Sequence, residues 1–437
     1  MKKGINVVLA AASALLISAP AFAFHSGGVA ECEGCHTMHN SQDGAAVATG
    51  LPQYQSGPYL LKANDQSGSC LNCHNSADTA PSGYHISTDS SKLGPGLAPV
   101  EATPGGDFAW LKKTYTFSIR GAATSDPGER HGHNIVASDY GYVPDSTLTT
   151  APGGTYPAAS LACSSCHDPH GKYRRLADGT QATTGLPIFN SGSYQNSADP
   201  VSGVAAVGVY RLLAGVGYQP KSLTGSYAFS NAAPDAVAPS SYNRLEATGQ
   251  THVAYGKGMS EYCANCHTAM LENGFTSGMK GLVHPAGNNA KLTAAIAGNY
   301  NSYVTSGVMT NTDATKAYSS LVPFELGTND YTKLKPLAIN TDTADQSAVA
   351  GTSNVSCLSC HRAHASGFES MARYNLTNEF MTIADASGAA QYDSSTTEGK
   401  VNYGKTVAEQ TAAYYGRPAT AFGPNARNLC NKCHAKD

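Results

Sequence analysis

The motif Cys-x-x-Cys-His occurs six times in this chain of 437 residues, and the six copies use all twelve cysteines. In c-type haem attachment, the two thiols of such a motif bond to one porphyrin and the adjacent His ligates its iron. The predicted attachment cysteines are Cys32, Cys35, Cys70, Cys73, Cys163, Cys166, Cys263, Cys266, Cys357, Cys360, Cys430 and Cys433. The predicted proximal ligands are His36, His74, His167, His267, His361 and His434. Disulfides or structural zinc sites would explain an even cysteine count but not a His after every pair. The motifs therefore predict six covalently bound haems.

The N-terminus has the pattern of a bacterial secretory signal peptide. Two lysines precede a largely apolar run over residues 7–16, and Ala21-Phe22-Ala23 supplies a small-x-small cleavage site. We therefore expect residues 1–23 to be removed and the mature chain to be secreted, which agrees with covalent haem attachment outside the inner membrane. No later stretch approaches the roughly 18 apolar residues of a spanning helix, so no membrane span is predicted.

The composition predicts a loop-rich fold. The chain holds 45 Gly and 22 Pro, and only 14% of its residues are charged, against about 25% in a typical soluble protein. Stretches such as 344–356 and 388–397 show little helical or strand periodicity. The expected fold class is therefore a multihaem c-type cytochrome, mostly coil and turns, with short helices around the haem motifs and few small strands. Its core would be formed by the six haems. No basic stripe suggests a nucleic-acid partner.

The number of histidines determines whether each predicted haem iron could have two axial His ligands. Six irons with two axial His ligands each need six further histidines, and the chain has nine beyond the motifs. These are His25, His39, His85, His131, His133, His170, His252, His284 and His364. Two His ligands on every iron would favour electron transfer over chemistry at the metal. We therefore predict no enzyme activity, because a multihaem reductase needs an open or weakly held axial position.

Three of these histidines belong to an internal repeat. Motifs one, three and five continue as Cys-x-x-Cys-His-x-x-His, through His39, His170 and His364, whereas the other motifs do not. If the helical turn continues, the second His lies on the same face as the first, so it should ligate a neighbouring iron. The chain reads as one hexahaem domain, residues 24–437, made of three intertwined dihaem modules. The modules span about 24–150, 151–300 and 301–437.

The candidate ligands are unevenly distributed among the modules. The C-terminal module has two haems but one candidate, His364, whereas the N-terminal module has two haems and five candidates. Either the chain folds back on itself, or an N-terminal His crosses to another molecule. A crossing of that kind is a head-to-tail contact, which repeats indefinitely if it does not close into a ring. The count alone leaves both possibilities open.

The segments around the motifs carry a family resemblance. The mature start, residues 24–31, runs directly into the first motif and on to His39, and the third motif continues as Asp168-Pro169-His170-Gly171. Further matching blocks are 183–195, 258–267, 357–367, 412–417 and 429–437. Together they resemble the outer-surface hexahaem cytochromes of metal-reducing bacteria. The resemblance runs from the signal peptide to the last residue and includes all six motifs in order.

This resemblance implies a function and an assembly. It implies extracellular filaments that carry electrons from outer-membrane or periplasmic cytochromes to mineral or electrode acceptors such as iron oxides. It also implies that one haem of the C-terminal part takes its second ligand from the next subunit, and the matching residue is His39. No ligand role is implied for His131 or His252. Seven candidates then remain for six places: His25, His39, His85, His133, His170, His284 and His364. The alternative is a soluble periplasmic shuttle, which would close its ligands within one chain.

Overall fold

A computed structural model describes most of the chain after the predicted signal peptide. The described residues are 32–41, 45–46, 51, 55–76, 84–223, 225, 227–239, 245–246, 252–271, 284–303, 317–339, 346–395 and 401–434. The predicted signal peptide and the candidate ligand His25 lie outside them.

Short helical segments occur at all six motifs. The α-helices are α2 (Cys32–Cys35), α3 (Gln66–His74), α4 (Met259–Cys263), α5 (Ala294–Ser302), α6 (Tyr331–Leu334) and α7 (Val407–Ala413). The third, fifth and sixth motifs begin in 3₁₀ turns at Cys163–Ser165, Cys357–Ser359 and Leu429–Lys432. Helix α3 starts after Asp65, whose carboxylate accepts a hydrogen bond from the Gly68 N–H at 2.7 Å and so satisfies one unpaired helix donor.

The strands are short and antiparallel. They are β1 (Tyr115–Ile119), β2 (Ala122–Asp126), β3 (Arg174–Arg175), β4 (Gln181–Ala182), β5 (Val207–Gly208), β6 (Asp235–Val237), β7 (Ala254–Lys257), β8 (Ile383–Ala384) and β9 (Ala390–Gln391). They form the pairs β1-β2, β6-β7 and β8-β9 and the three-stranded sheet β4-β3-β5. In the longest hairpin, Tyr115 lies opposite Asp126, and Gly121 takes the positive φ of +80° that the tight turn requires.

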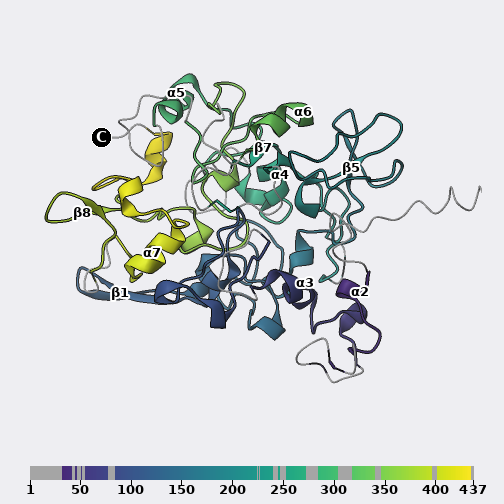
Figure 1. Ribbon diagram of the computed structural model, residues 1–437, viewed down its shortest axis with the longest axis horizontal. Helices are drawn as coiled ribbons and strands as arrows, with labels where there is room; N and C mark the ends of the chain where they lie inside the picture. The colour runs from purple at the N-terminus through teal and green to yellow at the C-terminus, as the bar shows by residue number, and fades with distance from the viewer. Residues whose placement is uncertain are drawn as a thin grey trace, which may run out of the picture.

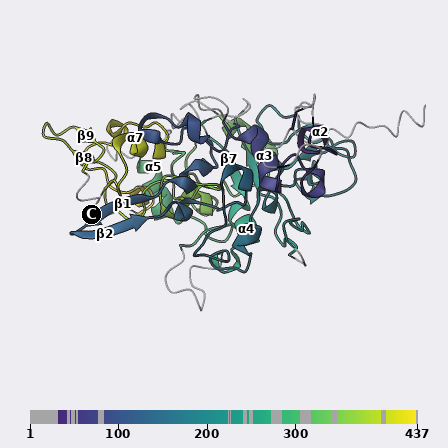
Figure 2. The ribbon, with the colours of Figure 1, turned by 90° about the horizontal axis from the view of Figure 1, so that it is seen from below.

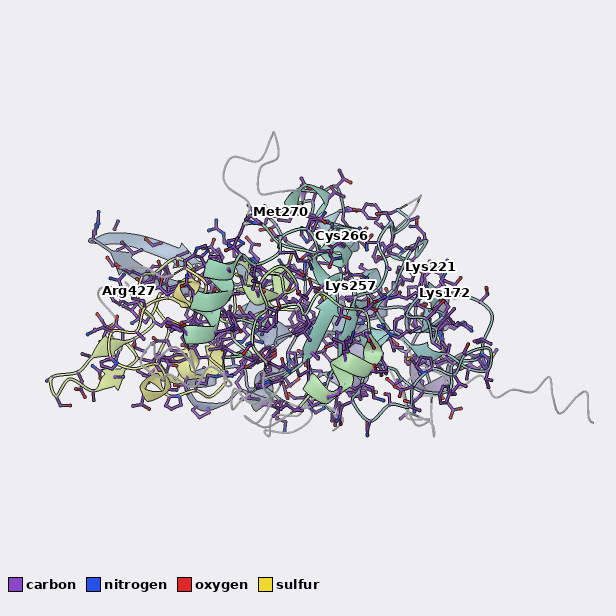
Figure 3. The ribbon with its side chains drawn as sticks, turned by 90° about the horizontal axis from the view of Figure 1, so that it is seen from above. Lys172, Lys221, Lys257, Cys266, Met270 and Arg427 are labelled. Atoms are coloured by element: carbon purple, nitrogen blue, oxygen red, sulfur yellow. The ribbon has the colours of Figure 1, made fainter. Side chains whose placement is uncertain are left out.

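The molecule is elongated, and the motifs follow its long axis. Helix α2, with the first motif, lies at one end, whereas α7 and the β8-β9 hairpin lie at the other in both views (Figures 1 and 2). Figure 3 shows Lys172 near the α2 end, Cys266 of the fourth motif nearer the middle and Arg427, just before the sixth motif, at the opposite end. The first and sixth motifs therefore belong to opposite ends of the subunit.

The chain also buries an aromatic core of its own. Trp110, Tyr300, Tyr303, Tyr374 and Phe422 are each at most 2% exposed and belong to one packed cluster. A buried tyrosine must also satisfy its hydroxyl group, and the Tyr300 hydroxyl donates to the carbonyl oxygen of Val322 at 2.7 Å. The predicted fold, mostly coil with short helices at the motifs and few small strands, is confirmed. Within the described ranges, every helix is too short or too polar to span a membrane.

Candidate haem-binding sites

A left-handed turn holds the proximal histidine of each odd-numbered motif. We call this arrangement the proximal-histidine clamp. In the fifth motif, His361 Nδ1 donates to the carbonyl oxygen of Ser370 at 2.8 Å. The Arg362 N–H donates to Met371 O at 2.8 Å, and the Arg373 N–H donates to Cys360 O at 2.7 Å. A carbonyl can only accept, so Nδ1 carries the ring proton and Nε2 is left to bind iron.

The same clamp recurs in the first and third motifs. His36 and His167 donate through Nδ1 to the carbonyl oxygens of Tyr59 at 3.1 Å and Arg211 at 2.8 Å. Two successive non-glycine residues have positive φ in every clamp: Tyr59 and Leu60, Arg211 and Leu212, Ser370 and Met371. Positive φ is uncommon for such residues and costs energy, so three identical turns indicate a specific role in fixing the ring.

Among the described residues, the second and fourth motifs lack this clamp. His74 Nδ1 donates to Tyr84 O at 2.7 Å and His267 Nδ1 to Pro152 O at 2.8 Å, and neither acceptor lies in a left-handed pair. The second and fourth motifs instead complete the helices α3 and α4. Their histidines are thus oriented by the same kind of bond, with the acceptor carbonyl in a different backbone setting.

Four proximal histidines face another predicted ligand. The ring centres are 6.3 Å apart for His36 and His170, 6.5 Å for His167 and His364, 6.0 Å for His267 and His133, and 5.9 Å for His434 and His284. Metal–nitrogen bonds of about 2 Å on both sides of an iron put two imidazole centres roughly 6 Å apart. These four pairs therefore fit the axial ligands of a bis-His haem.

The electrostatics of these pairs also suit a metal. Burial, followed by the neighbouring His267, lowers the pKa of His133 to about 4. Burial and then His167 lower the pKa of His364 to about 3. Both rings are neutral at pH 7, and the neutral imidazole is the form that binds a metal.

The six motifs make five junctions, each between one motif and the next. At two of these junctions, the first cysteine of one motif lies beside the first cysteine of the next. The Cys70 and Cys163 thiols are neighbours, and their interaction raises the pKa of Cys70 and lowers that of Cys163. The same holds for Cys263 and Cys357. The Cys163 and Cys357 N–H groups also donate to Ser67 Oγ at 3.1 Å and Ser260 Oγ at 3.0 Å. Motif two therefore packs on motif three, and motif four on motif five, across the predicted module boundaries.

The other three junctions use the second cysteine of an odd-numbered motif. Burial and then the charge of Cys73 raise the pKa of Cys35, and burial and then Cys166 raise that of Cys266. Burial also raises the pKa of Cys360, with Cys430 contributing. Cysteines bonded to porphyrin no longer titrate, but they stay neighbours. The six motifs thus adjoin in sequence order, and their porphyrins would form one row.

A hydroxyl group bridges each of these three junctions, and we call these groups the junction hydroxyls. Ser69 Oγ donates to Cys35 O at 3.3 Å, and the Tyr262 hydroxyl donates to Cys166 O. The Tyr374 hydroxyl lies 3.7 Å from Cys360 Sγ of motif five and also interacts with the Cys430 thiol of motif six. Ser69 and Tyr262 directly precede the first cysteines of motifs two and four, where Ser67 and Ser260 stand two residues earlier. Sequence reasoning missed this shared pattern, although the comparison of flanking residues could have revealed it.

Four of the remaining histidines differ in exposure. His39 is exposed. His85, His131 and His252 are only 3%, 0% and 4% exposed. His85 Nδ1 lies 3.5 Å from the Glu101 carboxylate and its ring packs on Tyr84. Among the described residues, no histidine ring is paired with that of His361.

Known proteins match this chain along almost its whole length. No family model matches it. It is 64% identical over 440 residues to the C-type cytochrome OmcS of Geobacter sulfurreducens, and the match covers all of both chains. The cryo-EM structure of the OmcS nanowires from that organism is 63% identical with a TM-score of 0.87. An Outer Membrane Cytochrome S filament from the same organism is 62% identical with a TM-score of 0.86. Both structural matches cover 95% of this chain and 100% of the other.

Proposed function

The chain belongs to the family of the c-type cytochrome OmcS, and on that premise we propose that it polymerises into an extracellular filament that conducts electrons. The observation that carries the proposal is 64% sequence identity, over the whole chain, to a protein whose solved structures are nanowires. A c-type cytochrome binds haem covalently, and the six motifs assign six haems to this chain.

The order of the motifs supports conduction. Cysteines of successive motifs are neighbours from the first motif to the sixth, and these end motifs lie at opposite ends of the long axis. The bound haem would supply the one-electron redox chemistry. The chain's own task is to fix the spacing and orientation of its carriers and to shield them from water.

The pairing of histidines supports head-to-tail assembly with a ligand donated between subunits. His170 of motif three faces His36 of motif one, and His364 of motif five faces His167 of motif three. Each of these two extra histidines thus faces the proximal histidine two motifs earlier. By this rule His361 needs the extra histidine of a seventh motif, which in a filament is His39 of the next subunit.

The exposure of the candidate histidines supports a choice of six distal ligands among the seven. A ligand histidine must open into the space that the porphyrin occupies, and every histidine of the four facing pairs is at least partly exposed. His85 is instead enclosed beside Glu101. We therefore assign the six distal positions to the other candidates, His25, His39, His133, His170, His284 and His364. His25 enters this set by elimination.

Two His ligands on every iron would close both axial positions, which would argue against catalysis at the metal. We propose that the protein is an electron conductor without enzyme activity. Outer-membrane or periplasmic cytochromes would be its donors, and minerals or electrodes its acceptors.

The test is cryo-electron microscopy of the purified, haem-loaded protein, together with its His39→Ala variant. We expect filaments from the native chain, with His39 at the fifth iron of the neighbouring subunit. His39→Ala should keep six haems but lose filaments and gain one high-spin iron. Met38→Ala, an equal truncation at an exposed neighbour, is the matched control and should polymerise normally.

Two outcomes would contradict the proposal. Uniform single particles of the native chain, with all six irons low-spin, would indicate a soluble shuttle. Normal filaments of His39→Ala with six low-spin irons would exclude donation by His39 while leaving conduction intact.

A further inference from the structure

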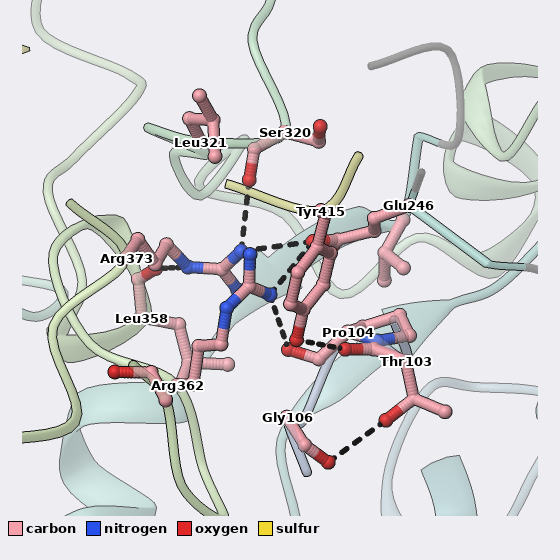
Figure 4. A network of polar contacts seen from close by, with 12 residues as sticks. Thr103, Pro104, Gly106, Glu246, Ser320, Leu321, Leu358, Arg362, Arg373 and Tyr415 are labelled. Carbon is pink, nitrogen blue, oxygen red and sulfur yellow. Dashed lines mark hydrogen bonds and ion pairs between the residues drawn. The ribbon is translucent and has the colours of Figure 1, made fainter. Parts of the chain in front are cut away.

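Three buried arginines gather around one glutamate beside the fifth motif. Arg362, Arg373 and Arg417 come from the C-terminal part of the chain and Glu246 from its middle. Their exposed fractions are 1%, 0%, 6% and 2%. We call these four residues the arginine cluster, and Figure 4 shows Arg362 and Arg373 converging on Glu246.

The cluster carries more positive than negative charge. Glu246 Oε2 accepts from Arg362 Nη1 at 2.8 Å and from Arg373 Nη1 at 3.2 Å. Arg417 Nη2 donates to the main-chain oxygen of Glu246 at 2.9 Å and to Ser320 Oγ at 2.8 Å. In the part of the chain that the structure describes, Arg417 pairs with no carboxylate. Three cations and one anion leave a surplus of two positive charges.

Hydrogen bonds and stacking offset this charge only in part. The Arg362 guanidinium stacks on the Tyr415 ring at 3.6 Å, and Tyr415 is held by a hydrogen bond to Thr103 O at 2.7 Å. Yet Arg362 Nε and Nη2 and Arg373 Nη2 have no hydrogen-bond partner among the described residues. Burial lowers the pKa of Arg417 to about 10, opposed by Glu246 and reinforced by Arg362. Cations enclosed in this way are costly unless a negative charge nearby compensates them.

The cluster is tied directly to the fifth motif. Arg373 Nε donates to the carbonyl oxygens of Leu358 at 2.6 Å and His361 at 3.1 Å, both within that motif. Arg362 is the residue after the proximal His361. The matching positions after His36 and His167 hold Thr37 and Asp168, which are neutral and acidic. Motif three has one nearby cation of this kind, Arg211, but it also has the acidic Asp168. The surplus of two positive charges therefore makes motif five the most cationic of these three motifs.

We propose that the arginine cluster raises the reduction potential of the haem on motif five above those on motifs one and three. The inference rests on the proposed function, because it requires a haem at each motif. Reduction of the ferric iron adds one electron to the haem, and fixed cations in a low-dielectric interior stabilise that added negative charge. With two neutral histidine ligands, reduction removes the positive charge of the ferric haem core and so eases its repulsion with the cluster. In a filament, the fifth haem of each subunit would be reduced before the first and third.

The test is a potentiometric titration of purified haem-loaded filaments, followed by absorbance and electron paramagnetic resonance. Arg417→Gln removes one positive charge and should shift one component of the six-haem titration to lower potential. Glu246→Gln removes the one carboxylate of the arginine cluster and should shift the same component to higher potential. Arg417→Lys keeps the charge but loses the guanidinium bonds, so it should restore most of the native potential. Arg427→Gln, at a partly exposed arginine paired with Glu379, is the charge-matched control and should shift this component little.

The signs of the shifts distinguish charge from packing. A merely structural cluster would loosen the haem pocket in every variant and move the potential the same way in all of them. Shifts of equal sign in Arg417→Gln and Glu246→Gln, or equal shifts in Arg417→Gln and Arg417→Lys, would overturn the inference. If Glu246→Gln does not fold, the two Arg417 variants decide alone. Native filaments with six haems and unmoved potentials in the variants would refute only this inference, whereas a native chain without filaments would refute the proposed function.

Discussion

The odd-numbered and even-numbered motifs share one five-residue signature but are held differently. The odd motifs have a left-handed clamp contributed by a later segment of the chain and carry an extra histidine three residues on. The second and fourth motifs end a short helix, and hydroxyl groups on that helix contact the motif on either side. Identical attachment chemistry therefore serves two structural roles. The odd motifs carry the extra histidines that we propose as ligands, and these even motifs supply contacts between neighbours.

The largest expected effect tests whether the extra histidine distinguishes the odd motifs. His170→Ala should open one of the six irons, because His170 faces His36 with ring centres 6.3 Å apart. A high-spin absorption and magnetic resonance signal from about one iron in six should appear. Met270→Ala, at the same position after the fourth motif, should leave every iron low-spin. An unchanged spectrum of His170→Ala would argue against this residue as a ligand.

The pH dependence of stability tests the contact between Glu325 and helix α4, which leads into the fourth motif. Burial raises the pKa of Glu325 to about 7, although bonds from the Met259 N–H at the start of α4 and from Asn354 lower it. The folded chain thus keeps a proton that the unfolded chain releases near pH 4.3. The resulting stabilisation is full below that pH and is lost as the pH rises through about 7.

Glu325→Gln is neutral at every pH and should remove this loss. The difference in unfolding free energy between pH 5 and pH 8 should shrink by roughly 1–3 kcal/mol. Chemical denaturation of the haem-loaded protein at both values measures it. Glu369→Gln, at an exposed carboxylate, is the control. A slope equal to that of the native chain would show that Glu325 does not titrate in this range.

A smaller effect tests the clamp of the odd motifs. Ser370 has a φ of +57° and accepts from His361 through its carbonyl oxygen. Ser370→Val places a branched side chain in the left-handed region and should destabilise the fold by about 1–2 kcal/mol. Ser370→Gly should be neutral or slightly stabilising. Denaturation midpoints measure both, with Ser302→Val in helix α5 as the control. Equal stability of the Val and Gly variants would mean that the turn is not strained.

The smallest effect concerns a junction hydroxyl. Ser69→Ala removes the bond to Cys35 O and should cost about 0.5–1.5 kcal/mol while all six haems stay attached. Ser91→Ala, at an exposed serine that bonds only within its own turn, is the control. A loss of stability no larger than in that control would show that the junction hydroxyl contributes nothing.

The coil-rich fold and the family were predictable from the sequence, and comparison confirms both. The module boundaries and the axial ligands stay predictions. The clamp could not have been predicted, because its acceptor carbonyls lie 23, 44 and 9 residues from His36, His167 and His361. The turns Tyr59-Leu60, Arg211-Leu212 and Ser370-Met371 contain no glycine and share no motif. Main-chain carbonyls carry no side-chain signature, so their partners depend on the path of the chain.

The sequence by itself determined the chemistry of attachment, because Cys-x-x-Cys-His is a local pattern whose function needs only five adjacent residues. It also indicated a shortage of ligands at the C-terminal end. Only the tertiary structure decided which histidines face one another, which motifs adjoin and where the surplus charge lies. Those features join residues up to 197 positions apart, such as His167 and His364, and contacts at that distance are set by packing rather than by local pattern.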